Sequence, residues 1–290
     1  MDVGTQRSPT TPEMLQYFKR HGVNRICGYP PHPGKRGYWT EEELIRTREL
    51  CESHGVRLDM VALPFLTSSH IDRENRGAIM LADSPERDRD IEHIHKMIEG
   101  CAKAGIPALK YNMSLLGVLR TPSTPGRGGS QYSTWNLSTT KPSTPLTRAG
   151  EIQEEQFWER IDYFLEKVVP VAEESKVRLA CHPHDPYTPP GYMGVERVLG
   201  TVDGLKKFIS MHENKFHGLN FCQGTVCEML DNPGEEIFDI IRYFGNKNKI
   251  FNVHFRNIKG GKLNFTEVFP DEGSVDMLKA LEVYKEVNYK

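Results

Sequence analysis

Short apolar runs alternate with amphipathic stretches along the whole chain. The runs that predict strands span 3–6, 25–29, 57–64, 108–114, 177–183, 218–224 and 250–257. Several of them are almost continuously apolar, as in "VRLACHP" at 177–183. Such runs are typical of parallel strands that are buried on both faces of a sheet.

Helix signals lie between these runs. The predicted helices span 11–20, 40–55, 84–105, 151–175, 202–212, 234–244 and 275–286. Thr40 and Glu43 have the spacing of a capping box, and Gly55 marks the end of the helix that they begin. This repeated strand–helix alternation predicts parallel βα units. No G-x-G-x-x-G motif or Walker A lysine is present, which favours a TIM barrel over a doubly wound nucleotide-binding sheet.

The chain is expected to form a single TIM-barrel domain over residues 1–290. It has seven βα units, whereas a closed barrel needs eight, so we expect the eighth strand to lie outside this sequence. Residues 115–150 are rich in Pro, Gly, Ser and Thr and follow the fourth strand. A long loop at this position predicts a lid over the active site or, equally, a mobile insertion without a catalytic role. Arg120 is among its most ligand-like side chains.

Composition and charge exclude several classes of function. Of the 290 residues, 38% are hydrophobic and 26% are charged, which is ordinary for a globular protein. The net charge is −2, without a basic block, so nucleic acid is not an expected partner. No apolar run is long enough to span a membrane, and the first residues lack the pattern of a signal peptide. We therefore expect a cytoplasmic protein whose six cysteines form no disulfide framework.

Three consecutive predicted strands end in residues that bind transition metals. His182 ends the fifth strand, Cys222 the sixth and His254 the seventh. Taken singly, each is more often a structural or packing residue. Neighbouring parallel strands bring their ends together, however, and two imidazoles with a thiolate suit Mn, Fe, Co or Zn. The sequence therefore predicts a shared metal site.

The segment "NVHFRN" adds candidate substrate contacts. Strand alternation places Asn252, His254 and Arg256 on one face. Arg256 has the chemistry to hold a substrate carboxylate through a bidentate pair. A salt bridge to a neighbouring acid of the barrel is an equally good interpretation.

Other candidates lie on or just after the fourth, fifth and seventh strands. Lys110 and Asn112 share one face of the fourth strand, and Tyr111 takes the other. His184 follows the fifth strand closely enough to reach substrate hydroxyls. Glu267 lies in an acidic segment after the seventh strand, and helix capping does not account for it.

Several motifs together resemble D-mannonate dehydratase. They are "HPHDP" on the fifth strand, "GLNFCQGT" on the sixth, "VHFRN" on the seventh and "F-x-E…G-x-VDM" across 265–277. The resemblance implies a xylose isomerase-like TIM barrel with a Mn(II) or Fe(II) site, which removes water from a sugar acid to give a 2-keto-3-deoxy acid. By position, His182, Cys222 and His254 match the metal ligands of the family. Arg256 and Asn257 match its "H-[LF]-R-N" element.

The sequence departs from this family at three places. His184 stands where the usual "HPDDP" motif has its first aspartate. The loop after the fourth strand is unusual. The "PDH" motif of the family's eighth strand, which supplies an acidic metal ligand and a histidine for proton transfer, has no counterpart before Lys290.

The resemblance predicts a metal-assisted β-elimination that converts D-mannonate to 2-keto-3-deoxy-D-gluconate and water. Arg256 would hold the carboxylate, and His184, Tyr111 and Glu267 are candidates for proton transfer. The expected substrate-binding residues are Asn112, Asn252, Asn257 and Arg120. A metal-dependent sugar isomerase or epimerase of the same superfamily and a barrel that binds a ligand without catalysis remain alternatives. We expect a small-molecule sugar acid as the only partner besides other copies of the chain, in a homo-oligomer.

Overall fold

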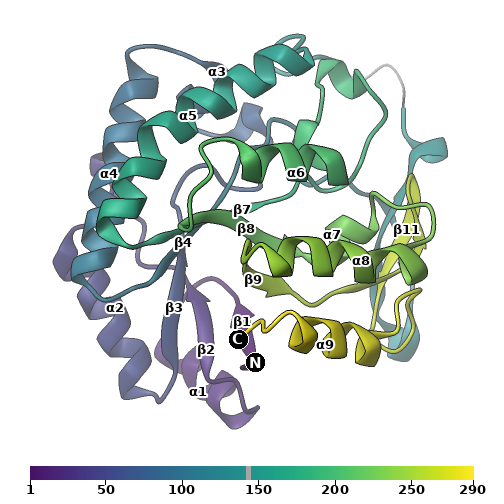
Figure 1. Cartoon of the computed structure of the whole chain (residues 1–290), viewed down its shortest axis with the longest axis horizontal. Coiled ribbons are helices and arrows are strands. Elements are labelled where there is room, and N and C mark those ends of the chain that lie inside the picture. The colour runs from purple at the N-terminus through teal and green to yellow at the C-terminus, as the bar shows by residue number, and fades with distance from the viewer. Residues whose placement is uncertain (142–144) are drawn as a thin grey trace.

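Seven parallel strands form one curled sheet with helices around its outside (Figure 1). The computed structural model describes residues 1–141 and 145–290. The parallel strands are β1 (Gly4–Gln6), β2 (Arg25–Gly28), β3 (Arg57–Ala62), β4 (Ala108–Asn112), β7 (Arg178–His182), β8 (His217–Cys222) and β9 (Ile250–His254). Their order in the sheet is β1-β2-β3-β4-β7-β8-β9. All seven coincide with predicted strands.

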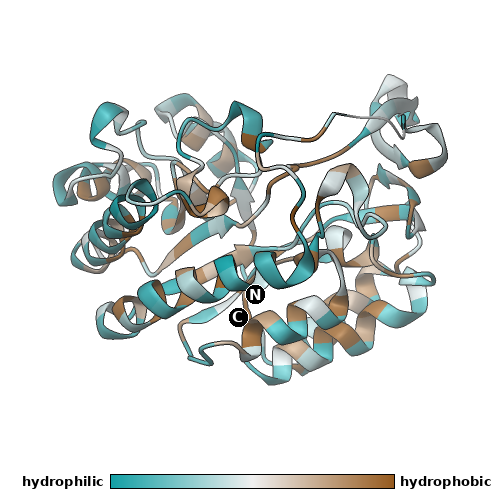
Figure 2. Cartoon of the chain, turned by 90° about the horizontal axis from the view of Figure 1, so that it is seen from above, coloured by the Kyte–Doolittle hydropathy of each residue, from teal (hydrophilic) through white to brown (hydrophobic). Residues whose placement is uncertain are grey.

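The helices follow the predicted pattern, with additional short ones at 78–81 and 223–227. They are α1 (Pro12–Arg20), α2 (Glu41–Ser53), α3 (Ala78–Leu81), α4 (Glu86–Lys103), α5 (Glu154–Ser175), α6 (Val202–Ser210), α7 (Gln223–Cys227), α8 (Pro233–Asn246) and α9 (Met277–Glu286). The capping box of Thr40 and Glu43 is formed at the start of α2. Figure 2 shows hydrophilic and hydrophobic residues alternating along the helices, as expected where one side of a helix packs on a sheet.

The predicted insertion at 115–150 is not a loop throughout its described residues, 115–141 and 145–150, and the rest of it lies outside the described residues. The insertion contains β5 (Thr121–Pro125) and β6 (Gln131–Asn136). These strands join β10 (Asn257–Gly261) and β11 (Asn264–Val268) in a second, antiparallel sheet with the order β10-β11-β6-β5. The pairing partners come from distant parts of the chain, with Phe265 opposite Trp135, so the local sequence gives little sign of it.

Apolar side chains form two separate layers on the parallel sheet. The large core lies between the strands and the helices and includes Leu109 and Tyr111 of β4. A much smaller cluster lies on the inner face of the sheet and consists of Cys27, Met60, Ala62, Ala108 and Ala180. Tyr29 and Phe251, both partly buried, pack against this cluster.

The edge strands β1 and β9 are linked through side chains. Nε2 of His254 lies 3.1 Å from Oε1 of Gln6, and Gln6 also donates to the hydroxyl of Tyr29 at 2.6 Å. Figures 1 and 2 both place the two termini next to each other. The sheet thus curls far enough for Gln6, at the end of β1, to contact His254, at the end of β9.

Candidate metal centre

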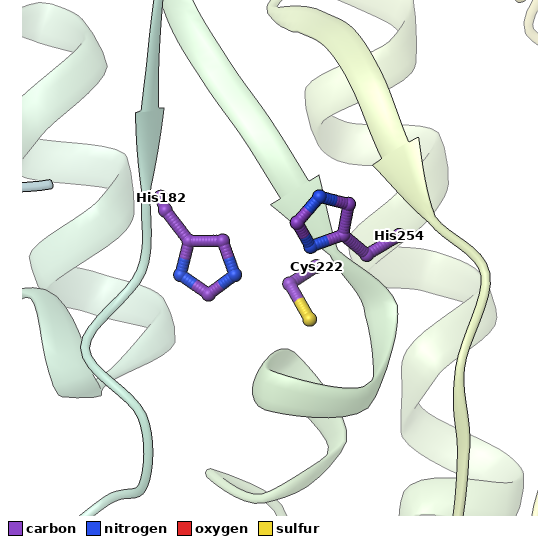
Figure 3. A group of neighbouring side chains, drawn as sticks. All are labelled: His182, Cys222 and His254. Carbon is purple, nitrogen blue, oxygen red and sulfur yellow. The ribbon is translucent and has the colours of Figure 1, made fainter. Parts of the chain in front are cut away.

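His182, Cys222 and His254 converge at the carboxyl ends of three neighbouring strands (Figure 3). Each is the last residue of its strand, and Cys222 is directly opposite His254 in the pairing of β8 with β9. One ligand atom from each residue lies within 4.8 Å of the others, so the three side chains could hold a metal ion. Cys222 ends β8 and immediately precedes α7, and this strand-to-helix junction fixes the position of its sulfur.

Hydrogen bonds leave one nitrogen of each imidazole available. Nδ1 of His182 lies 2.7 Å from the carbonyl of Pro183, which can only accept, so Nδ1 carries the proton and Nε2 keeps a lone pair. Nε2 of His254 contacts Gln6 and, at 3.3 Å, the amide of Asn220, which leaves Nδ1 as the second candidate ligand atom. Such partners orient metal-binding imidazoles. Two imidazoles and a sulfur fit a divalent transition metal, whereas Mg²⁺ and Ca²⁺ prefer all-oxygen shells.

The electrostatic surroundings favour the thiolate of Cys222. Burial alone would raise the pKa of this thiol, but the guanidinium of Arg256 and hydrogen bonds to His182 and His254 bring the pKa well below its usual range. Nη2 of Arg256 lies 3.7 Å from the sulfur. The close approach of Arg256 depends on Gly224, because a Cβ at this position would lie 2.3 Å from Nε of the arginine. A deprotonated thiol is the form that binds metals.

A network of ion pairs surrounds Arg256. Nη2 of Arg256 donates to Glu228 at 2.6 Å, to Thr225 at 2.9 Å and to Asp185 at 3.3 Å, and Nη1 pairs with Glu267 at 2.5 Å. Three carboxylates therefore already neutralise the arginine that the sequence suggested as a carboxylate clamp. The salt bridge that was the alternative interpretation of Arg256 is present.

Arg120 joins the same network from the antiparallel sheet. It pairs with Asp185 at 2.5 Å and with Glu267. Asp185 thus lies between two arginines, and although burial raises its pKa, Arg256 and Arg120 lower the pKa far below its ordinary value. The network connects the insertion after β4 to the strand ends that carry the candidate metal ligands.

Three predicted asparagines take different positions. Asn112 lies opposite His182 in the pairing of β4 with β7 and lines a small cavity with Ser68 and Asp185. Asn252 donates to Asn220 at 2.6 Å and so supports the residue that contacts His254. Asn257 is buried and donates to two backbone carbonyls at 2.8 Å each, which holds the loop before α9 in place.

His184 and Tyr111 are not brought together with the three candidate ligands. His184 is 2% exposed, donates from Nε2 to the carbonyl of Met113 at 2.6 Å and packs against Phe157. Burial lowers the pKa of His184 to about 3, so its ring is neutral. Tyr111 is 1% exposed and packs on Phe164 of α5. Both side chains belong to the core between sheet and helices.

Four residues that contact candidate site residues were not singled out from the sequence. They are Glu228, Thr225, Asn220 and Gln6. The only local signal was the position of Thr225 and Glu228 directly after the "FCQG" strand end. Gln6 is 248 positions from His254, and only the curl of the sheet brings the two together.

Comparison with known proteins places this site in a family. The family model of D-mannonate dehydratase (UxuA) matches residues 139–290, which is more than half of the chain. The chain belongs to the D-mannonate dehydratase family. The family predicted from the motifs is therefore confirmed.

Mannonate dehydratases from several bacteria are similar over most of the chain. The protein from Thermotoga maritima is 26% identical over 287 residues, a match that covers 87% of this chain and 76% of the relative. Mannonate dehydratase 2 from Halalkalibacterium halodurans is 26% identical over 310 residues and the match covers 97% of this chain and 85% of the relative.

Solved structures confirm the predicted fold. The mannonate dehydratase from Streptococcus suis has a TM-score of 0.84 at 22% identity, covering all of this chain and 82% of that one. A xylose isomerase domain protein from Planctomyces limnophilus has a TM-score of 0.60 at 14% identity, covering 99% and 87%. The chain has the xylose isomerase-like TIM-barrel fold, of which the described residues supply seven parallel strands. Within residues 1–141 and 145–290, no helix combines the length and apolar composition needed to cross a membrane.

Proposed function

We propose that the protein is a metal-dependent dehydratase that converts D-mannonate to 2-keto-3-deoxy-D-gluconate and water. The observation that carries this proposal is the convergence of His182, Cys222 and His254 within 4.8 Å in a chain of the D-mannonate dehydratase family. The relatives from Thermotoga maritima and Halalkalibacterium halodurans are named mannonate dehydratases, which supports this substrate.

The proposed ion is Mn(II) or Fe(II), held by His182, Cys222 and His254. The chemistry of the donor set fits this assignment, because two neutral imidazoles and one thiolate suit divalent transition metals. When bound, such an ion supplies Lewis-acid stabilisation of negative charge on the substrate. Arg256 would keep Cys222 deprotonated through its contact with the sulfur.

The elimination requires two proton transfers, and the tautomerisation that follows moves a further proton from the enol oxygen to C3. The proton on C2 of the sugar acid is removed, the C3–O bond breaks, and the leaving hydroxyl takes up a proton to depart as water. The resulting enol then tautomerises to the 2-keto-3-deoxy acid. Among the proton-transfer candidates, Glu267 is the one that reaches the surface of the site, with its side chain 25% exposed beside Arg120 and Arg256. We propose Glu267 for one of these transfers and Asn112, beside His182, for a substrate hydroxyl.

Incubation with D-mannonate and Mn(II), with the products followed by NMR, tests the proposal. We expect formation of a 2-keto-3-deoxy product, and we expect this formation to stop when the enzyme is first treated with a chelator. In the Glu267→Gln variant we expect kcat to be lower by about 10²- to 10⁴-fold. An isomer that retains all its oxygen atoms would instead indicate the isomerase or epimerase alternative. Metal binding without any conversion would indicate a non-catalytic barrel. We further propose a cytoplasmic homo-oligomer, which light scattering of the purified protein can check for its oligomeric state.

A further inference from the structure

Lys110 lies on the inner face of the barrel, in a surrounding of very small residues. It shares this face of β4 with Ala108 and Asn112. Its pairing partners on the neighbouring strands are Ala62 of β3 and Ala180 of β7, and Ala180 is in turn opposite Gly218. The residues opposite Lys110 on both neighbouring strands are therefore alanines, whose side chains carry no polar group that could pair with its ammonium.

The position of Lys110 is directly below the candidate metal ligands. Asn112, two residues further along β4, is opposite His182, so Lys110 lies one layer deeper in the barrel. Its charge acts on two of the candidate ligands. Burial lowers the pKa of His254, and the charge of Lys110 lowers it further by a smaller amount. The pKa of Lys110 is itself lowered by burial, and nearby Cys27 and Cys222 partly oppose that change.

Lys110 has no carboxylate partner within the described part of the chain, and the charges that act on it come from the cysteines. It is 8% exposed, and it forms no hydrogen bond or ion pair with residues 1–141 or 145–290. A buried ammonium without a carboxylate partner is costly, and a lysine with a perturbed pKa beside a candidate site is a candidate for ligand binding.

The other cations near the metal centre are already engaged. Arg256 pairs with three carboxylates, and Arg120 pairs with Asp185 and Glu267. Arg197 has two nitrogens without partners, but both are sealed from solvent and so out of reach of a ligand. A negatively charged group that enters the barrel would therefore meet its free counter-charge at Lys110.

We propose that Lys110 binds the carboxylate of the sugar acid, in place of the Arg256 clamp that the sequence suggested. This inference rests on the proposed function for its choice of ligand. It names a substrate-binding residue on β4 that is not part of the Arg256 network, and it makes the charge of the substrate a determinant of specificity. A neutral sugar alcohol would gain nothing from this contact.

Calorimetric binding to the Mn(II)-loaded protein tests the inference. The ligands are D-mannonate, D-gluconate and the uncharged D-mannitol, and the variants are Lys110→Met, Lys110→Arg and the surface control Lys103→Met. We expect Lys110→Met to raise the Kd of the aldonates about 10- to 100-fold, the range for a lost hydrogen bond to a charged group. D-mannitol binding should be unaltered in Lys110→Met, aldonate binding should be largely restored in Lys110→Arg, and Lys103→Met should behave as wild type.

Three outcomes would overturn the inference. These are an aldonate Kd within twofold of wild type, equal weakening of the aldonates and D-mannitol, and a wild type that binds neither aldonate. Lys110→Gln replaces the methionine variant if melting temperature or manganese content shows that the latter does not fold. If wild type forms product and Lys110→Met binds aldonates unchanged, the proposed function stands and the inference is wrong. If aldonate binding depends on Lys110 but no product forms, the inference stands and the proposed function is wrong.

Discussion

The parallel and antiparallel sheets contribute different chemistry to one site. The parallel sheet supplies His182, Cys222 and His254 from the ends of hydrogen-bonded neighbours. The antiparallel sheet places Glu267 of β11 in the network, together with Arg120 from just before β5. Positions 120 and 267 are 147 residues apart in the chain and meet only because β6 pairs with β11.

The candidate metal ligands and the charged residues around them are therefore positioned by different parts of the fold. Strand ends of a parallel sheet fix a set of ligand atoms through the backbone, without help from other parts of the chain. The ion pairs that hold Arg256 beside Cys222 require both sheets, because Asp185 comes from the loop after β7 and Glu267 from β11. Changes at the strand ends of the parallel sheet should therefore affect metal binding, and changes in the network should affect stability and, at Glu267, also the proposed proton transfer.

Removal of the sulfur ligand should have the largest effect. In Cys222→Ser we expect metal content and dehydratase activity to fall by more than about 100-fold, because even the loss of an outer-shell partner costs 10- to 100-fold. Elemental analysis and a product assay measure both. The matched control is Cys181→Ala, since Cys181 precedes His182 but packs in the outer core. Equal metal content in the two variants would show that the sulfur is not a ligand.

Neutralisation of Asp185 should have the largest effect on stability. Asp185→Asn leaves Arg120 and Arg256 short of a shared buried partner, and we expect a loss of about 3–5 kcal/mol in the free energy of unfolding. The folded pKa lies below the unfolded value of about 3.9, so this contribution is complete above that pH and is lost as the pH falls below it.

Denaturant unfolding across this pH range checks the Asp185 prediction. Between about pH 4 and pH 2, the free energy of unfolding of the wild type should fall more steeply than that of the asparagine variant. A variant as stable as wild type at neutral pH would show that the two arginines do not depend on Asp185.

The contribution of the antiparallel sheet should be smaller. Glu267→Gln removes one partner from Arg120 and one from Arg256, but both arginines keep other carboxylate partners and the Glu267 side chain is partly exposed. We therefore expect the free energy of unfolding to fall by about 1 kcal/mol. Asp271→Asn serves as the control, because Asp271 lies beyond β11, its side chain is 66% exposed, and its ion pair within the described residues is with the half-exposed Arg127. We expect no measurable change in its unfolding curve. Equal effects of the two substitutions would contradict a specific link between the sheets.

The sequence was sufficient for the features that depend on local periodicity. Continuous apolar runs gave the seven parallel strands, and strand ends gave the three candidate ligands, because neighbouring strands in such a barrel end at one rim. The orientation of Asn112 and Tyr111 on opposite faces of β4 followed from alternation and agrees with their positions in the structure.

Features that depend on long-range pairing were beyond the sequence. The antiparallel sheet joins residues 121–136 to residues 257–268, and nothing in the Ser- and Thr-rich segment indicates that partner. Strand alternation does not apply after β7 ends, so it could not show that His182 faces the site while His184 faces Phe157. Neither could it show that three acids occupy Arg256.

Cobalt substitution tests the central claim most directly. The claim is that one thiolate and two imidazoles, brought together at the ends of β7, β8 and β9, bind a single divalent ion. Titration of the metal-free protein with Co(II) should give a sulfur-to-cobalt charge-transfer band that saturates at one equivalent and is absent in Cys222→Ser. A Co(II) spectrum without this band in the wild type, or one that is unchanged in Cys222→Ser, would contradict the account.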